Sequence, residues 1–130
     1  MSAMTLRVDL PDRTAVETRA TTVVAEGLGG SFALLPRHLD IVAALVPGIL
    51  SYETEAGEER FLGTDRGVLV KTGARVAVAV AGAVEGARLE TLRERVHEAF
   101  LSLDAQERAA SVALARLEAG AIRQILRMEG

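Results

Sequence analysis

Cysteine is absent from the 130-residue sequence, and so is tryptophan. The missing thiols exclude disulfides, thiolate metal sites and a cysteine nucleophile, and they fit a reducing compartment. Aromatic residues make up only 3% of the chain, whereas alanine occurs 22 times. A core of valine, leucine, isoleucine and alanine lets its elements approach closely, but each element then buries little area.

Long apolar runs and an excess of basic charge are also missing. The apolar run at 41–46 falls far short of the roughly 18 residues that a membrane span needs. The first residues lack a charged and then apolar leader, so we expect no export or import signal. A net charge of -3 argues against a general nucleic-acid binder. The remaining composition, 49% hydrophobic and 25% charged, is that of a globular domain.

The sequence divides near residue 86 into two parts with different periodicities. Before it, apolar residues alternate with polar ones and turn residues are frequent, which predicts short strands. The clearest is 76–81, where Val76, Val78 and Val80 share one face and alanines form another that a second layer can approach. Further strands are predicted at 6–10, 14–18, 21–25, 31–35, 41–46, 49–53, 60–62 and 68–71. Eight to ten strands predict an antiparallel β-sandwich or flattened barrel over residues 1–86.

From residue 87 onward there is no proline, and the apolar period becomes helical. Two stripes follow three- and four-residue steps: Leu89, Leu92, Val96, Ala99, Phe100 and Leu103, then Ala110, Leu114, Leu117, Ala121, Ile125 and Met128. Between them, Asp104 and Glu107 suit a helix-capping arrangement. Residues 87–130 are therefore predicted to form an antiparallel two-helix hairpin, which gives the chain a β-plus-α fold.

Residues suited to catalysis are few. His38 and His97 are the only histidines, and neither has a second ligand at metal spacing. His97 is interpreted as a surface or helix-packing residue, and His38 as part of a turn or an interface.

The segment 27–30 lacks the Gly-Lys-Ser/Thr ending of a phosphate loop, so it is interpreted as a strand connection. Glu58–Glu59 is interpreted as a solvated hairpin tip. A Ser-His-Asp arrangement stays open, but no Gly-x-Ser-x-Gly turn is present, and we predict a non-enzymatic interaction protein without a metal.

The second predicted helix carries one charge pattern. Arg116, Arg123 and Arg127 fall within an arc of roughly 40° on a helical projection. One interpretation is a solvated face. The other is a basic ridge that meets an acidic partner segment, since guanidinium groups suit carboxylates.

The order of these features, together with one motif, resembles a known family. Residues 30–40 read Gly-Ser-Phe-Ala-Leu-Leu-Pro-Arg-His-Leu-Asp, and residues 45–48 read Leu-Val-Pro-Gly. They are similar to the Gly-x-x-Gly-x-Leu-Pro-x-His-x-Pro and Leu-x-Pro-Gly of the epsilon subunit of bacterial F-type ATP synthases. Ala33 and Asp40 depart from the pattern, where the family usually has glycine and proline. A divergent member, such as that of an alternative F-type ATPase, would look like this.

The resemblance implies a rotor subunit that holds the gamma subunit, rests on the membrane c-ring and regulates ATP hydrolysis through its C-terminal helices. It implies a peripheral place on the cytoplasmic side of the bacterial inner membrane, with neither membrane insertion nor nucleic acid. The resemblance also implies that six residues would face the ring or gamma, namely Gly29, Gly30, Ser31, Pro36, Arg37 and His38. In the extended, inhibited state, Arg116, Arg123 and Arg127 would meet acidic residues of the catalytic alpha and beta subunits.

Some members of this family bind ATP at the hairpin through Ile/Leu-Asp-x-x-Arg-Ala. Residues 89–94 match at Leu89 and Arg93, but Glu90 replaces the aspartate and Glu94 the alanine. Glu94 adds negative charge where a triphosphate would lie. Glu90 and Arg93 are thus weak candidates, ATP binding is expected to be weak or absent, and no cofactor is predicted.

Two alternatives to a rotor subunit remain, a free-standing β-sandwich that binds a small ligand under a helical lid and an adaptor protein. A ligand site needs polar side chains that converge on an inward face. The readable alternation instead points valine, leucine and alanine inward, which favours a protein-binding role.

Overall fold

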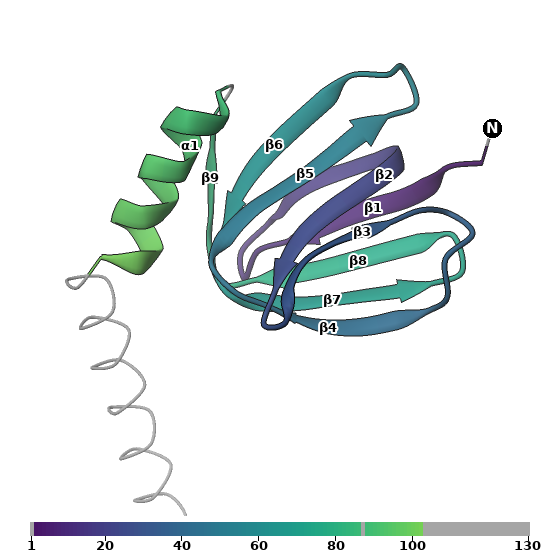
Figure 1. Cartoon of the computed structure of the whole chain (residues 1–130), viewed down its shortest axis with the longest axis horizontal. Coiled ribbons are helices and arrows are strands. Elements are labelled where there is room, and N and C mark those ends of the chain that lie inside the picture. Colours follow the sequence, from purple (N-terminus) through teal and green to yellow (C-terminus); the bar gives the residue numbers. More distant parts are fainter. Residues whose placement is uncertain (1, 87, 103–130) are drawn as a thin grey trace, which may run out of the picture.

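The computed structural model describes residues 2–86 and 88–102, which form nine strands and then a helix (Figure 1). The second predicted helix, with Arg116, Arg123 and Arg127, lies outside the described residues. The strands are β1 (Met4–Asp9), β2 (Thr14–Gly27), β3 (Gly30–Leu34), β4 (Ile41–Leu45), β5 (Gly48–Thr54), β6 (Glu59–Thr64), β7 (Gly67–Thr72), β8 (Arg75–Val80) and β9 (Ala83–Glu85). Helix α1 (Leu89–Val96) continues into a π-helical turn, η1 (His97–Leu101). The short strand β9 was not predicted.

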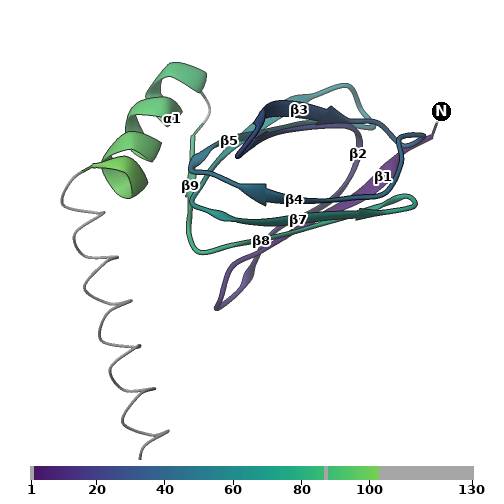
Figure 2. The ribbon, with the colours of Figure 1, turned by 60° about the horizontal axis from the view of Figure 1, so that its bottom comes forward.

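The strands form two layers that share β2 (Figure 2). The order is β1-β8-β7-β4-β2-β5-β6-β9, with β3 on β2 and a further pairing between β1 and β2. The first half of β2 pairs with β1, and its second half pairs with β3 and β5. The two strands predicted at 14–18 and 21–25 are therefore one strand of 14 residues. Its pairing register shifts between Ala20 and Thr22, and such an irregularity turns a strand from one layer toward the other.

One strand pair is parallel, which corrects the prediction of a wholly antiparallel sandwich. β1 pairs with β8 in parallel, with Leu6 opposite Val76 and Val8 opposite Val78. β8 forms a tight hairpin with β7 and therefore runs antiparallel to it. β1 pairs with the other edge of β8. Hydrophobic alternation is the same in both directions, so the sequence pattern does not reveal the sense of this pairing.

The main core lies between the two layers. It holds fifteen buried residues: Met4, Leu6, Val8, Ala20, Val23, Ala25, Leu34, Leu45, Leu50, Tyr52, Leu62, Leu69, Val76, Val78 and Val80. The predicted inward face of β8 is thereby confirmed. Ala77 and Ala79 are exposed, so no described element packs on the alanine face, contrary to expectation.

A second, smaller cluster joins α1 to the outer face of β5, β6 and β9. Ile49, Leu92 and Val96 are buried there, with Phe61, Val84, Leu89 and Phe100 packed around them. The predicted apolar stripe is confirmed at its four large described residues, whereas Ala99 is exposed. Gly63 makes the close approach possible, because a Cβ there would lie 2.4 Å from Val96 Cγ2 and 2.7 Å from Val84 Cγ2.

Within the part of the chain that the structure describes, no helix has the length and apolar character to cross a bilayer.

Candidate interaction surface

The glycine-rich segment at 27–30 forms the tight turn between β2 and β3. Gly27 pairs with Gly30, and Leu28 and Gly29 lie at the tip. Gly30 has a φ of 118°, which glycine adopts far more readily than other residues. The amide of Leu28 donates to the carbonyl of Ala44, 3.2 Å away, so the turn is fixed to β4. The interpretation as a strand connection is confirmed, and the turn presents Gly29, Gly30 and Ser31 to solvent.

The loop that carries Pro36, Arg37 and His38 links β3 to β4. His38 closes its turn twice. Its amide donates to the carbonyl of Leu35 at 3.0 Å, and its Nδ1 accepts from the amide of Leu35 at 3.3 Å. The His38 side chain is exposed, and its described contact is with its own turn. The interpretation of His38 as part of a turn is confirmed, and its role at an interface stays a prediction.

Lys71 ties this loop to the turn between β7 and β8. It is the only lysine of the chain, yet it is 1% exposed. Its ammonium donates to the carbonyls of His38 at 2.6 Å and Gly73 at 2.8 Å. The carboxylate of Asp40 accepts from the amide of Gly73 at 2.7 Å. Sequence reasoning missed this anchor. The pattern that could have indicated it is a single lysine two residues after Leu69, which places its side chain on the same inward face of the strand.

The turn at 28–31 and the loop at 36–38 lie at opposite ends of β3 (Figure 1). The structure therefore does not bring the six predicted interface residues into one cluster. Each group occupies its own end of the sandwich. The two groups of residues can therefore take part in two separate protein contacts rather than in a single one.

An exposed apolar strip on the outer face of β4, β7 and β8 runs between these two ends. It consists of Val42, Ala44, Val68, Ala77 and Ala79, and we call it the outer strip. The pairing places Ala44, Val68 and Ala79 in one row across the three strands. Val42 is 75% and Val68 46% exposed, and contiguous apolar surface of this kind marks interaction sites. The sequence showed the alternation but not which face the fold would leave open.

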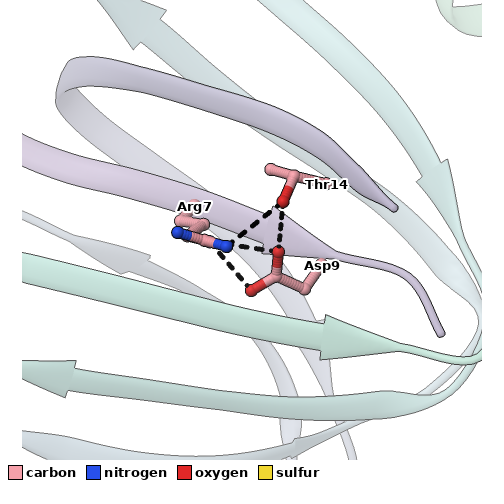
Figure 3. A network of polar contacts seen from close by, with 3 residues as sticks. All are labelled: Arg7, Asp9 and Thr14. Atoms are coloured by element: carbon pink, nitrogen blue, oxygen red, sulfur yellow. Dashed lines mark hydrogen bonds and ion pairs between the residues drawn. The ribbon is translucent and has the colours of Figure 1, made fainter. Parts of the chain in front are cut away.

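A polar network borders the outer strip on β1 (Figure 3). Arg7 and Asp9 stand opposite Ala77 and Ala79 across the β1–β8 pairing. The Nε of Arg7 lies 3.1 Å from both carboxylate oxygens of Asp9, and the hydroxyl of Thr14 donates to the same carboxylate at 2.7 Å. Two hydrogen bonds lower the pKa of Asp9 below its usual 3.8. The one from Thr14 contributes most and the one from Arg7 contributes less. The border of the strip therefore stays charged at neutral pH.

The remaining candidates do not assemble into a catalytic or metal centre. Glu90 and Arg93 are exposed on α1, and His97 is exposed at its end. Glu58 lies on the β5–β6 hairpin as predicted and pairs with Arg60 at 2.6 Å. Across the described residues, no three His, Cys, Asp or Glu side chains are grouped so that they could hold a metal ion.

Comparison with known proteins identifies a family. The family described as "ATP synthase, Delta/Epsilon chain, beta-sandwich domain" matches residues 3–86. The ATP synthase epsilon chain 2 of Cereibacter sphaeroides is 37% identical over 127 residues, which cover 96% of this chain and 87% of the relative. The epsilon chain 2 of Paraburkholderia xenovorans is 32% identical over 127 residues, covering 95% of this chain and 91% of that one.

Solved structures share the fold. A chain in the Euglena gracilis mitochondrial ATP synthase structure, described as OSCP/F1/c-ring in rotational state 1, superimposes with a TM-score of 0.63 at 21% identity. The match covers 76% of this chain and 64% of that one. A chain of the Tetrahymena thermophila central stalk and c-ring structure gives 0.53 at 13% identity, covering 65% and 67%. The sandwich, the match over residues 3–86 and the identity to epsilon chains together show that this chain belongs to the delta/epsilon chain family of ATP synthases.

Proposed function

We propose that this chain is a non-catalytic subunit of the central stalk of an F-type ATP synthase, where it couples the catalytic head to the membrane c-ring. The observation that carries the proposal is the 37% identity to an ATP synthase epsilon chain over nearly the whole length of both proteins. The outer strip, with a loop or turn at either end, supplies the surface that a subunit held between other proteins needs.

We assign different partners to the two ends of the sandwich, and the outer strip between them shares the partner of one end. The outer strip is apolar, so burial against another protein stabilises that contact in proportion to the area covered. We assign it, together with the loop at Pro36, Arg37 and His38, to the gamma subunit. The turn at Gly29, Gly30 and Ser31 presents backbone amides and a hydroxyl, which suit the polar loops of the c-ring.

A subunit that passes torque between these partners must not yield at its contacts. Backbone pairing fixes the turn at 28–31, because β2 and β3 pair up to its base and Leu28 bonds to β4. The buried Lys71 ammonium holds the opposite loop to the β7–β8 turn. Both proposed contact segments are therefore attached to the sheet directly.

The regulatory role belongs to residues 87–130, which we propose as a helical hairpin separate from the sandwich of residues 1–86. Its first helix rests on a cluster of only three buried residues, which suits an element that leaves the sandwich in one state and returns in another. In the released state, Arg116, Arg123 and Arg127 meet acidic residues of the alpha and beta subunits. Glu90 and Arg93 remain weak candidates for an ATP contact, and no cofactor is part of the proposal.

The family places the chain as a peripheral part of a membrane complex. We assign it to the cytoplasmic side of the bacterial inner membrane, consistent with relatives from Cereibacter and Paraburkholderia.

Co-purification of the full chain with a gamma subunit and a c-ring tests the proposal. We expect the wild-type chain to be retained by both. The double variant Val42→Asp/Val68→Asp puts two charges on the outer strip. It should no longer bind the gamma subunit, but its far-UV circular dichroism spectrum should be unchanged. Ala56→Asp, at the exposed tip of the β5–β6 hairpin, is the matched control and should be retained like the wild type. Failure of the wild type to bind either partner would overturn the proposal.

A further inference from the structure

We propose that a groove between β2 and β6 receives one extended, basic segment of another polypeptide, which pairs with both strands. The β2–β6 groove is bounded by residues 15–18 on one side and residues 59–62 on the other. It consists of two adjoining hollows of about 900 Å³ and about 450 Å³, and Glu17 and Thr18 line the smaller one. The inference does not depend on the rotor assignment.

The β2 wall of the groove has an unpaired edge. The amide of Thr5 donates to the carbonyl of Ala74 across the parallel pairing, so the backbone groups of Thr5 face β8 and those of Leu6 face β2. The hydrogen-bonded pair is therefore Leu6 with Thr18, and the amide and carbonyl of Glu17 point away from β1. On that side β5 pairs with β2 only from Ala20 onward, so no described strand covers Glu17.

The β6 wall has an unpaired edge of the same kind. The amide of Asp65 donates to the carbonyl of Gly82 at 3.0 Å, which fixes the alternation along β6. The backbone groups of Gly63 and Phe61 consequently point to the side on which β9 lies. β9 pairs only with residues 62–64, so Phe61 extends past its end with no described backbone partner there.

The floor and the rim of the groove define the chemistry of the segment that fits it. Val16, Tyr52 and Leu62 line the floor, and the burial of Tyr52 raises the pKa of its phenol. Four carboxylates lie along the rim, those of Glu17, Glu58, Glu59 and Glu85. The guanidinium of Arg60 is the one basic group among the lining residues, and it already pairs with Glu58.

These features favour a single extended strand over a second copy of the chain. An edge strand of another sandwich carries its own sheet on one side, so it cannot pair with two facing edges at once. A free segment can donate and accept on both sides, while alternate side chains reach the floor and the rim. The excess of carboxylates selects lysine or arginine at the rim positions and small apolar residues at the floor positions.

Titration of the full-length chain with the peptide acetyl-Lys-Val-Lys-Val-Lys-Val-amide tests the inference, with amide hydrogen exchange as the readout. We expect binding that slows exchange at Glu17 and Phe61. The peptide with glutamate in place of lysine is the control and should not bind. Binding of the acidic peptide, or slowed exchange only elsewhere, would contradict the inference. So would fast exchange at both amides with the basic peptide in large excess.

Glu17→Pro separates backbone pairing from charge. Proline removes the amide that faces the groove but no hydrogen bond to β1, so an edge position of this kind tolerates it. We expect Glu17→Pro to lower the affinity for the basic peptide about tenfold, and Glu17→Gln to lower it about twofold. Equal affinities for the two variants would refute strand pairing.

If Glu17→Pro fails to fold, the charge-reversed variant Glu59→Lys/Glu85→Lys takes its place, because both side chains are exposed. It should abolish binding of the basic peptide and admit the acidic one, and unchanged binding would refute the inference. Slow exchange at Glu17 and Phe61 without any peptide would show that another part of this chain, or a second copy, already fills the groove. That result would overturn the choice of occupant.

Discussion

The two hydrophobic clusters of this chain differ in size and in the way the fold builds them. The core between the layers draws fifteen buried residues from eight strands, and each strand is also held by backbone pairing. The cluster beneath α1 has three buried residues, and the helix makes no backbone pairing to the sheet. Each side chain at the helix contact therefore carries a much larger share of its stability. A fold of this kind can release the helix and keep the sandwich.

Matched leucine truncations test this difference most directly. Leu6 and Leu92 are both 0% exposed, but Leu6 lies in the main core and Leu92 under α1. We expect Leu6→Ala to lower the free energy of unfolding of the sandwich by about 2–5 kcal/mol. Leu92→Ala should release α1 and leave the sandwich nearly unchanged. Urea unfolding measures the first effect, and hydrogen exchange of the α1 amides the second. Equal loss of sandwich stability in both variants would remove the distinction.

A substitution at Gly63 attacks the helix contact from the sheet side. A Cβ at this position meets Val96 and Val84 at less than 3 Å, so Gly63→Ala forces α1 outward at a cost of about 1–3 kcal/mol. The expected result is fast exchange across α1 with an intact sandwich spectrum. Gly29→Ala serves as the control, since a Cβ there has no neighbour within 4 Å. A protected helix in Gly63→Ala would show that the cluster adapts more easily than its packing indicates.

Loss of the Lys71 anchor should have a smaller effect, confined to one end of the sandwich. Lys71→Met leaves the carbonyls of His38 and Gly73 without their donor, but it also removes a buried ammonium that is costly to desolvate. The net loss should be about 1 kcal/mol. Fast exchange should appear around His38, while Arg66→Met, an exposed charge-matched control, should show neither change. An unaltered loop in Lys71→Met would refute the anchor.

The smallest expected effect concerns the network at the border of the outer strip. The folded pKa of Asp9 lies below its usual 3.8, so its contribution to stability is complete above the unfolded pKa and is lost as pH falls through the folded value. The difference in unfolding free energy between the wild type and Asp9→Asn should therefore shrink below about pH 4. Urea titrations between pH 2.5 and about 6 measure it. Asp12→Asn controls for the lost charge, and a constant difference would contradict the network.

Periodicity in the sequence predicted the elements better than their arrangement. The inward face of Val76, Val78 and Val80 and the stripe of Leu92 and Val96 followed from alternation and helical spacing alone. The same alternation at Val42 did not reveal an open outer face, because which side of a strand is covered depends on neighbours distant in the sequence. The parallel direction of β8 against β1 was hidden for the same reason.

The candidate site was predicted in part. The turn at Gly29 and the loop at His38 lie on the surface, at the two ends of the strand that the sequence predicted at 31–35. Their contacts with the ring or the gamma subunit stay predictions. Lys71 and the unpaired edge at Glu17 escaped sequence reasoning. Each depends on a partner far along the chain, or on the lack of one among the described strands, and local residue patterns carry no record of either.

The burial of Lys71 gives this chain a built-in reporter. Its ammonium is the only side-chain amine of the protein, and the fold seals it behind the loop at His38. An amine-selective acylating reagent therefore modifies that position only when the loop opens. The labelling rate at this one atom would reveal, by mass spectrometry, whether the loop ever loosens while the assembled complex turns over.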